Sequence, residues 1–120
     1  MAFVLIVDDE VGIAQLLEEV LKDEGHRTVL ATNGKQALER VAAERPDLII
    51  TDFMMPVMDG ATLVRELAAQ PENESIPVII MSSVPETTIR ERCPKFALLI
   101  RKPFSIFDVV DRVSEILNGS

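Results

Sequence analysis

The chain has 120 residues, 48% of them hydrophobic, and this size and composition predict one globular domain spanning residues 1–120. Its formal net charge of -8 disfavours direct binding to nucleic acids or anionic membranes, and fits a bound cation or a partner with a basic surface. The longest apolar run is too short to span a membrane, no signal peptide is recognisable, and a single cysteine, Cys93, excludes an internal disulfide framework. We therefore expect a cytoplasmic protein.

The first half of the chain alternates short apolar runs with amphipathic helices. Residues 3–7, FVLIV, form an unbroken apolar run, which is typical of a strand buried on both faces. Apolar residues at helical spacing then predict a helix that ends at Gly25, followed by a second strand at residues 27–32. Asn33 is suited to cap a second helix, which Pro46 closes.

The second half repeats this alternation three times. Pro94 limits the fourth helix to a short segment, so we expect that helix to be brief or irregular. Strands are predicted at residues 47–51, 76–81 and 96–100, and helices are predicted to begin at Asp59, Pro85 and Ser105.

Five strand–helix units in succession predict an α/β fold with one parallel sheet and helices on both faces. Right-handed crossovers leave few topologies, and the leading candidate is the flavodoxin-like strand order 2-1-3-4-5. In that order, ligands bind beyond the carboxyl ends of strands one and three, where the chain order reverses.

Four of the five predicted strands end in side chains with charge or hydroxyl groups. Asp8 and Asp9 follow the first strand, Asp52 the third, Ser82 the fourth and Lys102 the fifth. Three neighbouring carboxylates repel one another and require a cation, and an oxygen-only set suits Mg²⁺ or Mn²⁺. A lysine and a hydroxyl opposite that metal can neutralise a phosphoryl group from the other side.

Each of these residues has an ordinary interpretation when it is taken alone. Acids are common at helix starts, lysines are mostly solvated, and serines are frequent in loops. Their joint placement at one sheet edge favours a functional site. A carboxylate can itself accept a phosphoryl group, and the absence of a Gly-rich phosphate loop argues against a bound nucleotide.

Four segments carry a specific family resemblance: VDDE at 7–10, TDFMMPVMDG at 51–60, IPVIIMSS at 76–83 and RKPF at 101–104. In this order on a β/α framework they resemble the receiver domain of two-component response regulators, over residues 3 to about 117. Asp52 matches the phosphoacceptor of that family.

The resemblance also implies a metal site and a phosphoryl-binding pair. Asp9 matches a direct metal ligand, Asp8 an acid that acts largely through water, and the Met54 backbone carbonyl a further ligand. In the same family the switch hydroxyl matches Ser82. The phosphate-binding lysine matches Lys102, whose peptide bond to Pro103 would be cis.

The chain departs from the family pattern in the segment that leads to the fifth strand. The position three residues before the lysine, usually aromatic, is Leu99, and the stretch between Ser82 and Lys102 is short. We therefore expect altered coupling to the surface formed by helix four, strand five and helix five. Met54 and Val84 are apolar where the family orients an attacking water, which predicts slow self-dephosphorylation.

Three functions are compatible with these observations. The first is a phosphoacceptor switch, not a turnover enzyme, that receives its phosphoryl group from a histidine kinase or phosphotransfer protein and then binds a downstream partner. The second is an interaction module that has lost phosphate signalling, although it would have kept every site residue. The third, a Mg²⁺-dependent phosphohydrolase, needs an acid where Met54 stands. Homodimerisation through the fourth and fifth helices is a further option by analogy.

Overall fold

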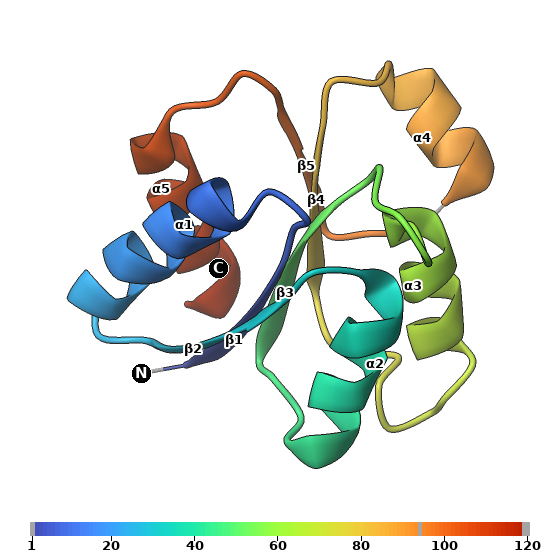
Figure 1. Ribbon diagram of the computed structural model, residues 1–120, viewed down its shortest axis with the longest axis horizontal. Coiled ribbons are helices and arrows are strands. Elements are labelled where there is room, and N and C mark those ends of the chain that lie inside the picture. The colour runs from blue at the N-terminus through green and yellow to red at the C-terminus, as the bar shows by residue number, and fades with distance from the viewer. Residues whose placement is uncertain (1, 94, 119–120) are drawn as a thin grey trace.

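The computed structural model describes residues 2–93 and 95–118, in which five strands alternate with five helices (Figure 1). No helix in this part of the chain is both long enough and apolar enough to cross a membrane. The strands are β1 (Phe3–Val7), β2 (Arg27–Ala31), β3 (Leu48–Asp52), β4 (Val78–Ser82) and β5 (Leu98–Arg101), and the helices are α1 (Val11–Asp23), α2 (Gly34–Ala43), α3 (Gly60–Ala68), α4 (Glu86–Arg92) and α5 (Ile106–Leu117).

The strands form one parallel sheet in the order β2-β1-β3-β4-β5, which confirms the predicted topology. Helices α1 and α5 cover one face of the sheet, and α2, α3 and α4 lie against the other (Figure 1). β1 and β3 are neighbours in the middle, with Ile6 in register with Ile50. Their carboxyl ends therefore lie side by side at the point where the chain order reverses.

The unbroken apolar runs of the strands supply two separate cores. Alternate residues of a strand point to opposite faces, so Leu5 and Ile49 pack toward α2 and α3 while Ile6 and Ile50 pack toward α1 and α5. All four side chains are completely buried. A strand covered by helices on both faces needs apolar residues at every position, as the sequence of β1 has.

Three helices begin at the residues that the sequence indicates. The Asn33 Oδ1 atom accepts a hydrogen bond from the backbone N–H of Gln36 at 2.8 Å, and Asp59 Oδ1 accepts one from Thr62 at 2.8 Å. Ser105 caps α5 by accepting from Phe107. Each cap satisfies a backbone donor that the first turn of a helix leaves free.

The last three strands begin and end one or two residues later than the sequence predicts. Pro77 cannot donate a ladder hydrogen bond, and β4 begins directly after it. At the other end, Asp52 pairs with Met81 and Ser82 with Arg101, so the ladder extends into the polar residues. As a consequence Asp52 and Ser82 belong to the rigid sheet itself.

A close contact brings the start of α3 against the end of β3. The backbone N–H of Gly60 donates to the carbonyl of Phe53 at 2.9 Å. A Cβ atom at position 60 would lie 2.5 Å from the carbonyl oxygen of Asp52, which no side chain can tolerate without movement of the backbone. The glycine therefore fixes the distance between α3 and the strand that carries Asp52.

Candidate functional site

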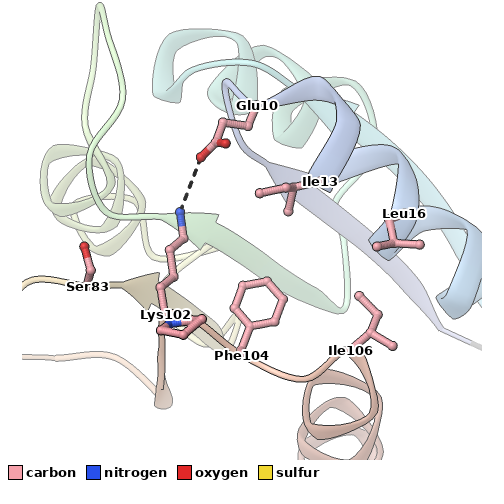
Figure 2. A pocket seen from close by; sticks show the side chains of 8 residues that line it. Glu10, Ile13, Leu16, Ser83, Lys102, Phe104 and Ile106 are labelled. Atoms are coloured by element: carbon pink, nitrogen blue, oxygen red, sulfur yellow. Dashed lines mark ion pairs between the residues drawn. The ribbon is translucent and has the colours of Figure 1, made fainter.

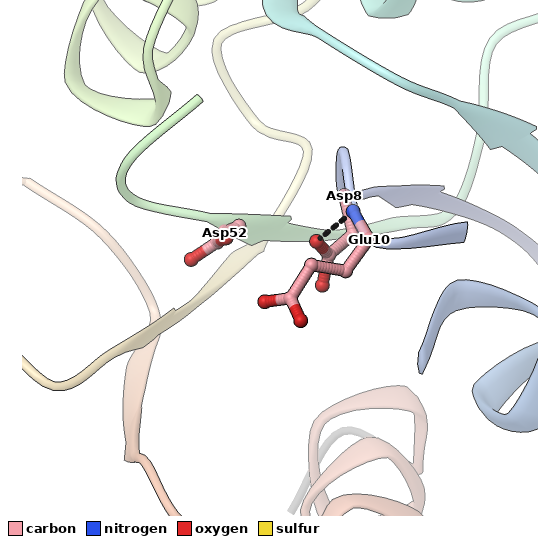
Figure 3. Close-up of side chains that lie close together, drawn as sticks. All are labelled: Asp8, Glu10 and Asp52. Carbon is pink, nitrogen blue, oxygen red and sulfur yellow. Dashed lines mark hydrogen bonds between the residues drawn. The ribbon is translucent and has the colours of Figure 1, made fainter. Parts of the chain in front are cut away.

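The carboxyl edge of the sheet brings together the polar residues that the sequence placed there. Asp52 ends β3, Ser82 ends β4, and Asp8 and Lys102 directly follow β1 and β5. Figure 3 shows the side chains of Asp52, Asp8 and Glu10 close together at this edge. Because Asp8 and Asp52 lie at the ends of adjacent parallel strands, the spacing of the ladder determines how far apart they are.

Burial and the neighbouring Lys102 have opposite effects on the pKa of the Asp52 carboxylate. Only 5% of the residue is exposed, and burial raises its pKa by penalising the charged form. The ammonium group of Lys102, with Nζ 3.2 Å from Oδ1 of Asp52, opposes that rise. Lys102 is half-buried, and its peptide bond to Pro103 is cis, as the resemblance implied.

Asp8 carries an unsatisfied buried oxygen. Its Oδ1 accepts a hydrogen bond from the backbone N–H of Glu10 at 2.9 Å, whereas Oδ2 has no partner among the described residues. The residue is fully buried, and this burial raises the pKa of Asp8 to about 6, with the charge of Asp52 contributing in the same direction. A buried anionic oxygen without a donor is costly unless a cation binds it.

Three carboxylates are arranged to share a cation. Asp8, Glu10 and Asp52 each offer an oxygen, and these oxygens lie within 4.8 Å of one another. An all-oxygen set of this kind fits a hard divalent cation. Asp9 is exposed and lies outside this group, although its negative charge still raises the pKa of Asp52.

The sequence analysis missed Glu10. Its carboxylate lies 3.8 Å from Lys102 Nζ (Figure 2). The same Nζ lies 3.2 Å from Oδ1 of Asp52, so the lysine faces both acids. Glu10 follows the acidic pair directly and precedes the first turn of α1, which made a helix-start role the simpler interpretation. No sequence signal distinguishes the two roles, because the direction of the side chain depends on the turn between β1 and α1.

The remaining predicted residues lie around this centre. Ser82 is buried, and its Oγ accepts a hydrogen bond from the backbone N–H of Val84 at 2.9 Å. The side chain of Met54 is 58% exposed in the loop after β3, and a ligand role for its carbonyl stays a prediction. In the same loop Val57 has a φ of 69°, and Met58 N–H donates to Pro56 O, a tight turn that a β-branched residue adopts with strain.

An apolar groove of about 560 Å³ begins beside Lys102 and Glu10 and runs between α1 and the start of α5 (Figure 2). Leu16, on the outer surface of α1, is 50% exposed although it is a large aliphatic residue. The remaining residues that line the groove are Ile13, Ser83, Pro103, Phe104 and Ile106.

The segment between β4 and β5 contains the shortest of the five helices that the structure describes. Helix α4 has seven residues, as short as the sequence predicted, and Ile89 is its only buried residue. Leu99 is half-buried and packs against the core on the α2–α3 side of the sheet, as does Val84. An aliphatic side chain therefore occupies the position at which the resemblance implies an aromatic ring.

Comparison with known proteins places these features in a family. The model of the response regulator receiver domain matches residues 4–114. Sporulation initiation phosphotransferase F of Bacillus subtilis is 40% identical over 116 residues, which span 95% of this chain and 92% of that protein. The sensor histidine kinase TmoS of Ectopseudomonas mendocina is 33% identical over 96% of this chain, which spans only 12% of the kinase.

A solved structure agrees with the computed one. The receiver domain of a signal transduction histidine kinase from Syntrophus aciditrophicus superposes with a TM-score of 0.91 at 35% identity, covering 99% of this chain and 92% of that chain. The family match extends over nearly the whole described chain, and the sheet order and the acidic edge agree with it. This chain belongs to the family of response regulator receiver domains.

Proposed function

We propose that the chain, as one receiver domain over residues 1–120, is a phosphoacceptor switch in a two-component phosphorelay. The observation that carries this proposal is the Asp52 carboxylate, fixed at a strand end with Lys102 Nζ 3.2 Å away. A buried oxygen of Asp8 that has no partner within residues 2–93 and 95–118 lies nearby. A carboxylate nucleophile fixed in a rigid sheet, with the ammonium group of a lysine on one side, is positioned for phosphoryl transfer.

The reaction that this geometry supports is attack by an Asp52 oxygen on the phosphorus of a phosphohistidine. The P–N bond breaks, and its electron pair goes to the imidazole nitrogen, which takes up a proton. Lys102 stays beside the oxygens of the transferred group, and the Ser82 hydroxyl can donate to one of them. The product is an aspartyl phosphate, and the phosphoryl donor would be a histidine kinase or a phosphotransfer protein.

Mg²⁺ or Mn²⁺ is the cofactor that the acidic group fits. Asp8 and Asp52 would hold it together with Glu10 or Asp9, and with the Met54 carbonyl that the family resemblance assigns. Such an ion supplies positive charge to the phosphoryl oxygens. The charge balance supports this assignment, because Lys102 faces Glu10 and Asp52, and Asp8 Oδ2 has no partner among the residues that the structure describes.

The groove between α1 and α5 is suited to dock the phosphoryl donor. It is continuous with the site, since Lys102 and Glu10 line both, and the apolar side chains that line it remain uncovered in the single chain. A donor helix with an apolar face would cover Leu16 and Phe104 while its histidine approached Asp52. The downstream partner, and a homodimer through α4 and α5, remain predictions.

The phosphate-independent module is the weaker alternative. A module without phosphate signalling would have no use for the buried, mutually repelling carboxylates of Asp8 and Asp52, which are costly to keep. A phosphohydrolase is disfavoured by the apolar Met54, which cannot serve as an acid or base.

Our first prediction tests the acceptor. Incubation with Mg²⁺ and acetyl phosphate should add one phosphoryl group to the chain, as read by intact mass, and Asp52→Asn should abolish the addition. Asp47→Asn changes an aspartate at the opposite end of β3 and should be phosphorylated like the wild type. No metal-dependent addition to folded wild-type protein would refute the proposed function.

Our second prediction concerns the cost of the buried acid. The pKa of Asp8 is raised from 3.8 to about 6, so the folded state binds this proton more tightly than the unfolded state does. Stability is therefore lost as pH rises through this range, and Asp8→Asn in EDTA should increase the free energy of unfolding at pH 7 by roughly 1–3 kcal/mol.

The gain from Asp8→Asn should fall as pH drops below about 6, and it should disappear well below 3.8, where the wild-type carboxyl is protonated in both states. Urea unfolding followed by circular dichroism measures it, and the variant should gain less stability from added Mg²⁺ than the wild type. Asp9→Asn, at an exposed neighbour, should change stability in EDTA by no more than about 0.5 kcal/mol. A gain of equal size at pH 4 and pH 7 would contradict the electrostatic explanation.

Our third prediction is slow loss of the phosphoryl group. Neither Met54 nor Val84 can orient a water, so the half-life after removal of acetyl phosphate should be on the order of minutes or longer. Met54→Asn should shorten it, whereas Val57→Asn, an exposed change in the same loop, should not. Time-resolved intact mass gives both rates, and decay of the wild type within seconds would overturn the prediction.

Our fourth prediction tests the groove. Purified histidine kinases from the source organism are autophosphorylated, and the kinase that transfers fastest to the wild type is selected. Leu16→Asp should slow transfer from that kinase by about tenfold or more, because a charge replaces an apolar contact, with the acetyl phosphate reaction unchanged. Ala68→Asp, at an exposed position of α3, is the control and should leave both rates unaltered. Equal transfer to both variants would exclude the groove as the docking surface.

A further inference from the structure

The backbone of Val84 is held from two sides. Its N–H donates to Ser82 Oγ at 2.9 Å, and its carbonyl accepts a hydrogen bond from Nη1 of Arg101. Val84 lies in the loop between β4 and α4 and is half-buried against the core. One residue thus connects the proposed switch hydroxyl to a guanidinium group on a different strand.

Arg101 is fixed at its backbone, and its long side chain is exposed. It ends β5 in register with Ser82, and the next backbone N–H, that of Lys102, donates to the Ser82 carbonyl at 2.9 Å. Its exposed side chain reaches back to Val84. The residue also borders a hollow of about 300 Å³ between β5 and α5. Asp108 and Arg112 line the same hollow.

We infer that the hydrogen bond from Arg101 to Val84 is a latch that forms only in the unphosphorylated protein. The inference rests on the proposed function. To donate to a phosphoryl oxygen on Asp52, the Ser82 hydroxyl turns toward β3, and Val84 either follows it or loses its hydrogen bond. When Val84 follows the hydroxyl, its carbonyl moves away from the guanidinium, because the backbone of Arg101 is fixed in the ladder.

The latch couples the state of Asp52 to the surface of the protein, which the side chain of Leu99 cannot do. Leu99 is aliphatic and packs in the same core as Val84, so it offers no polar group whose hydrogen bonding could change with the state of Asp52. The Arg101 guanidinium instead leaves the Val84 carbonyl on phosphorylation and donates to solvent or to a binding partner. The released guanidinium enters the hollow between β5 and α5, and phosphorylation thereby changes the charge presented on that surface.

A latch present in one of two arrangements biases the equilibrium toward that arrangement. Its removal should therefore favour the phosphoryl-bound arrangement. Beryllofluoride with Mg²⁺ is a stable mimic of the phosphoryl group, and its bound form is observed directly by ¹⁹F NMR. Arg101→Ala should bind beryllofluoride roughly two- to tenfold more tightly than the wild type, the range expected for one lost hydrogen bond.

Arg112→Ala is the matched control. It removes an identical side chain from the same hollow, but that side chain is paired with Glu115 within α5. Loss of a positive charge near an anionic ligand weakens binding on its own, so tighter binding by Arg101→Ala alone is diagnostic. Arg101→Lys keeps a donor for the Val84 carbonyl and should restore wild-type affinity.

A second measurement follows the latch in the wild type. On saturation with beryllofluoride the guanidinium NMR signals of Arg101 should shift, while those of Arg112 should not. If beryllofluoride binds but Arg101→Ala binds it no more tightly than Arg112→Ala does, the latch is refuted and the proposed function stands. If folded wild type binds no beryllofluoride, the proposed function fails and the latch fails with it.

Discussion

Negative charge confined at the end of a parallel sheet is the constraint on which the site depends. Asp8 and Asp52 are both almost completely shielded from water, and the positive charge that faces them, Lys102, is shared with Glu10. In a low-dielectric environment this imbalance is unfavourable, and a bound divalent cation would lessen it. The sheet keeps the acids in place against their mutual repulsion, because each is attached to a strand that is hydrogen-bonded and buried on both faces.

The fold could be predicted almost entirely from sequence pattern. Unbroken apolar runs such as FVLIV alternate with amphipathic segments five times, which leaves little choice beyond a parallel sheet with helices on both faces. The ends of the last three strands could not be predicted by the same rule. Hydrophobicity ends before Asp52 and Ser82, but ladder pairing with the neighbouring strands continues through them. Strand ends depend on partners that are distant in sequence.

The site was predictable in its residue types and less so in its geometry. Motif spacing brought Asp8, Asp52 and Lys102 together correctly, because strand ends determine where these side chains begin. It could not show that Glu10, and not Asp9, extends toward Asp8 and Asp52, since one turn of backbone decides between them. The hydrogen bond from Arg101 to Val84 could not be predicted either, because the partner of a long flexible side chain depends on the folded structure.

The two cores on opposite faces of the sheet share no side chains, and this separation has an evolutionary consequence. The layer of α1 and α5 borders the groove beside Lys102, whereas α2, α3 and α4 pack on the other face. Substitutions in layers without mutual contacts have nearly additive effects. After gene duplication, one layer can therefore diverge while the other is conserved. Changes beside the groove can therefore accumulate independently of changes in the helices on the far side of the sheet.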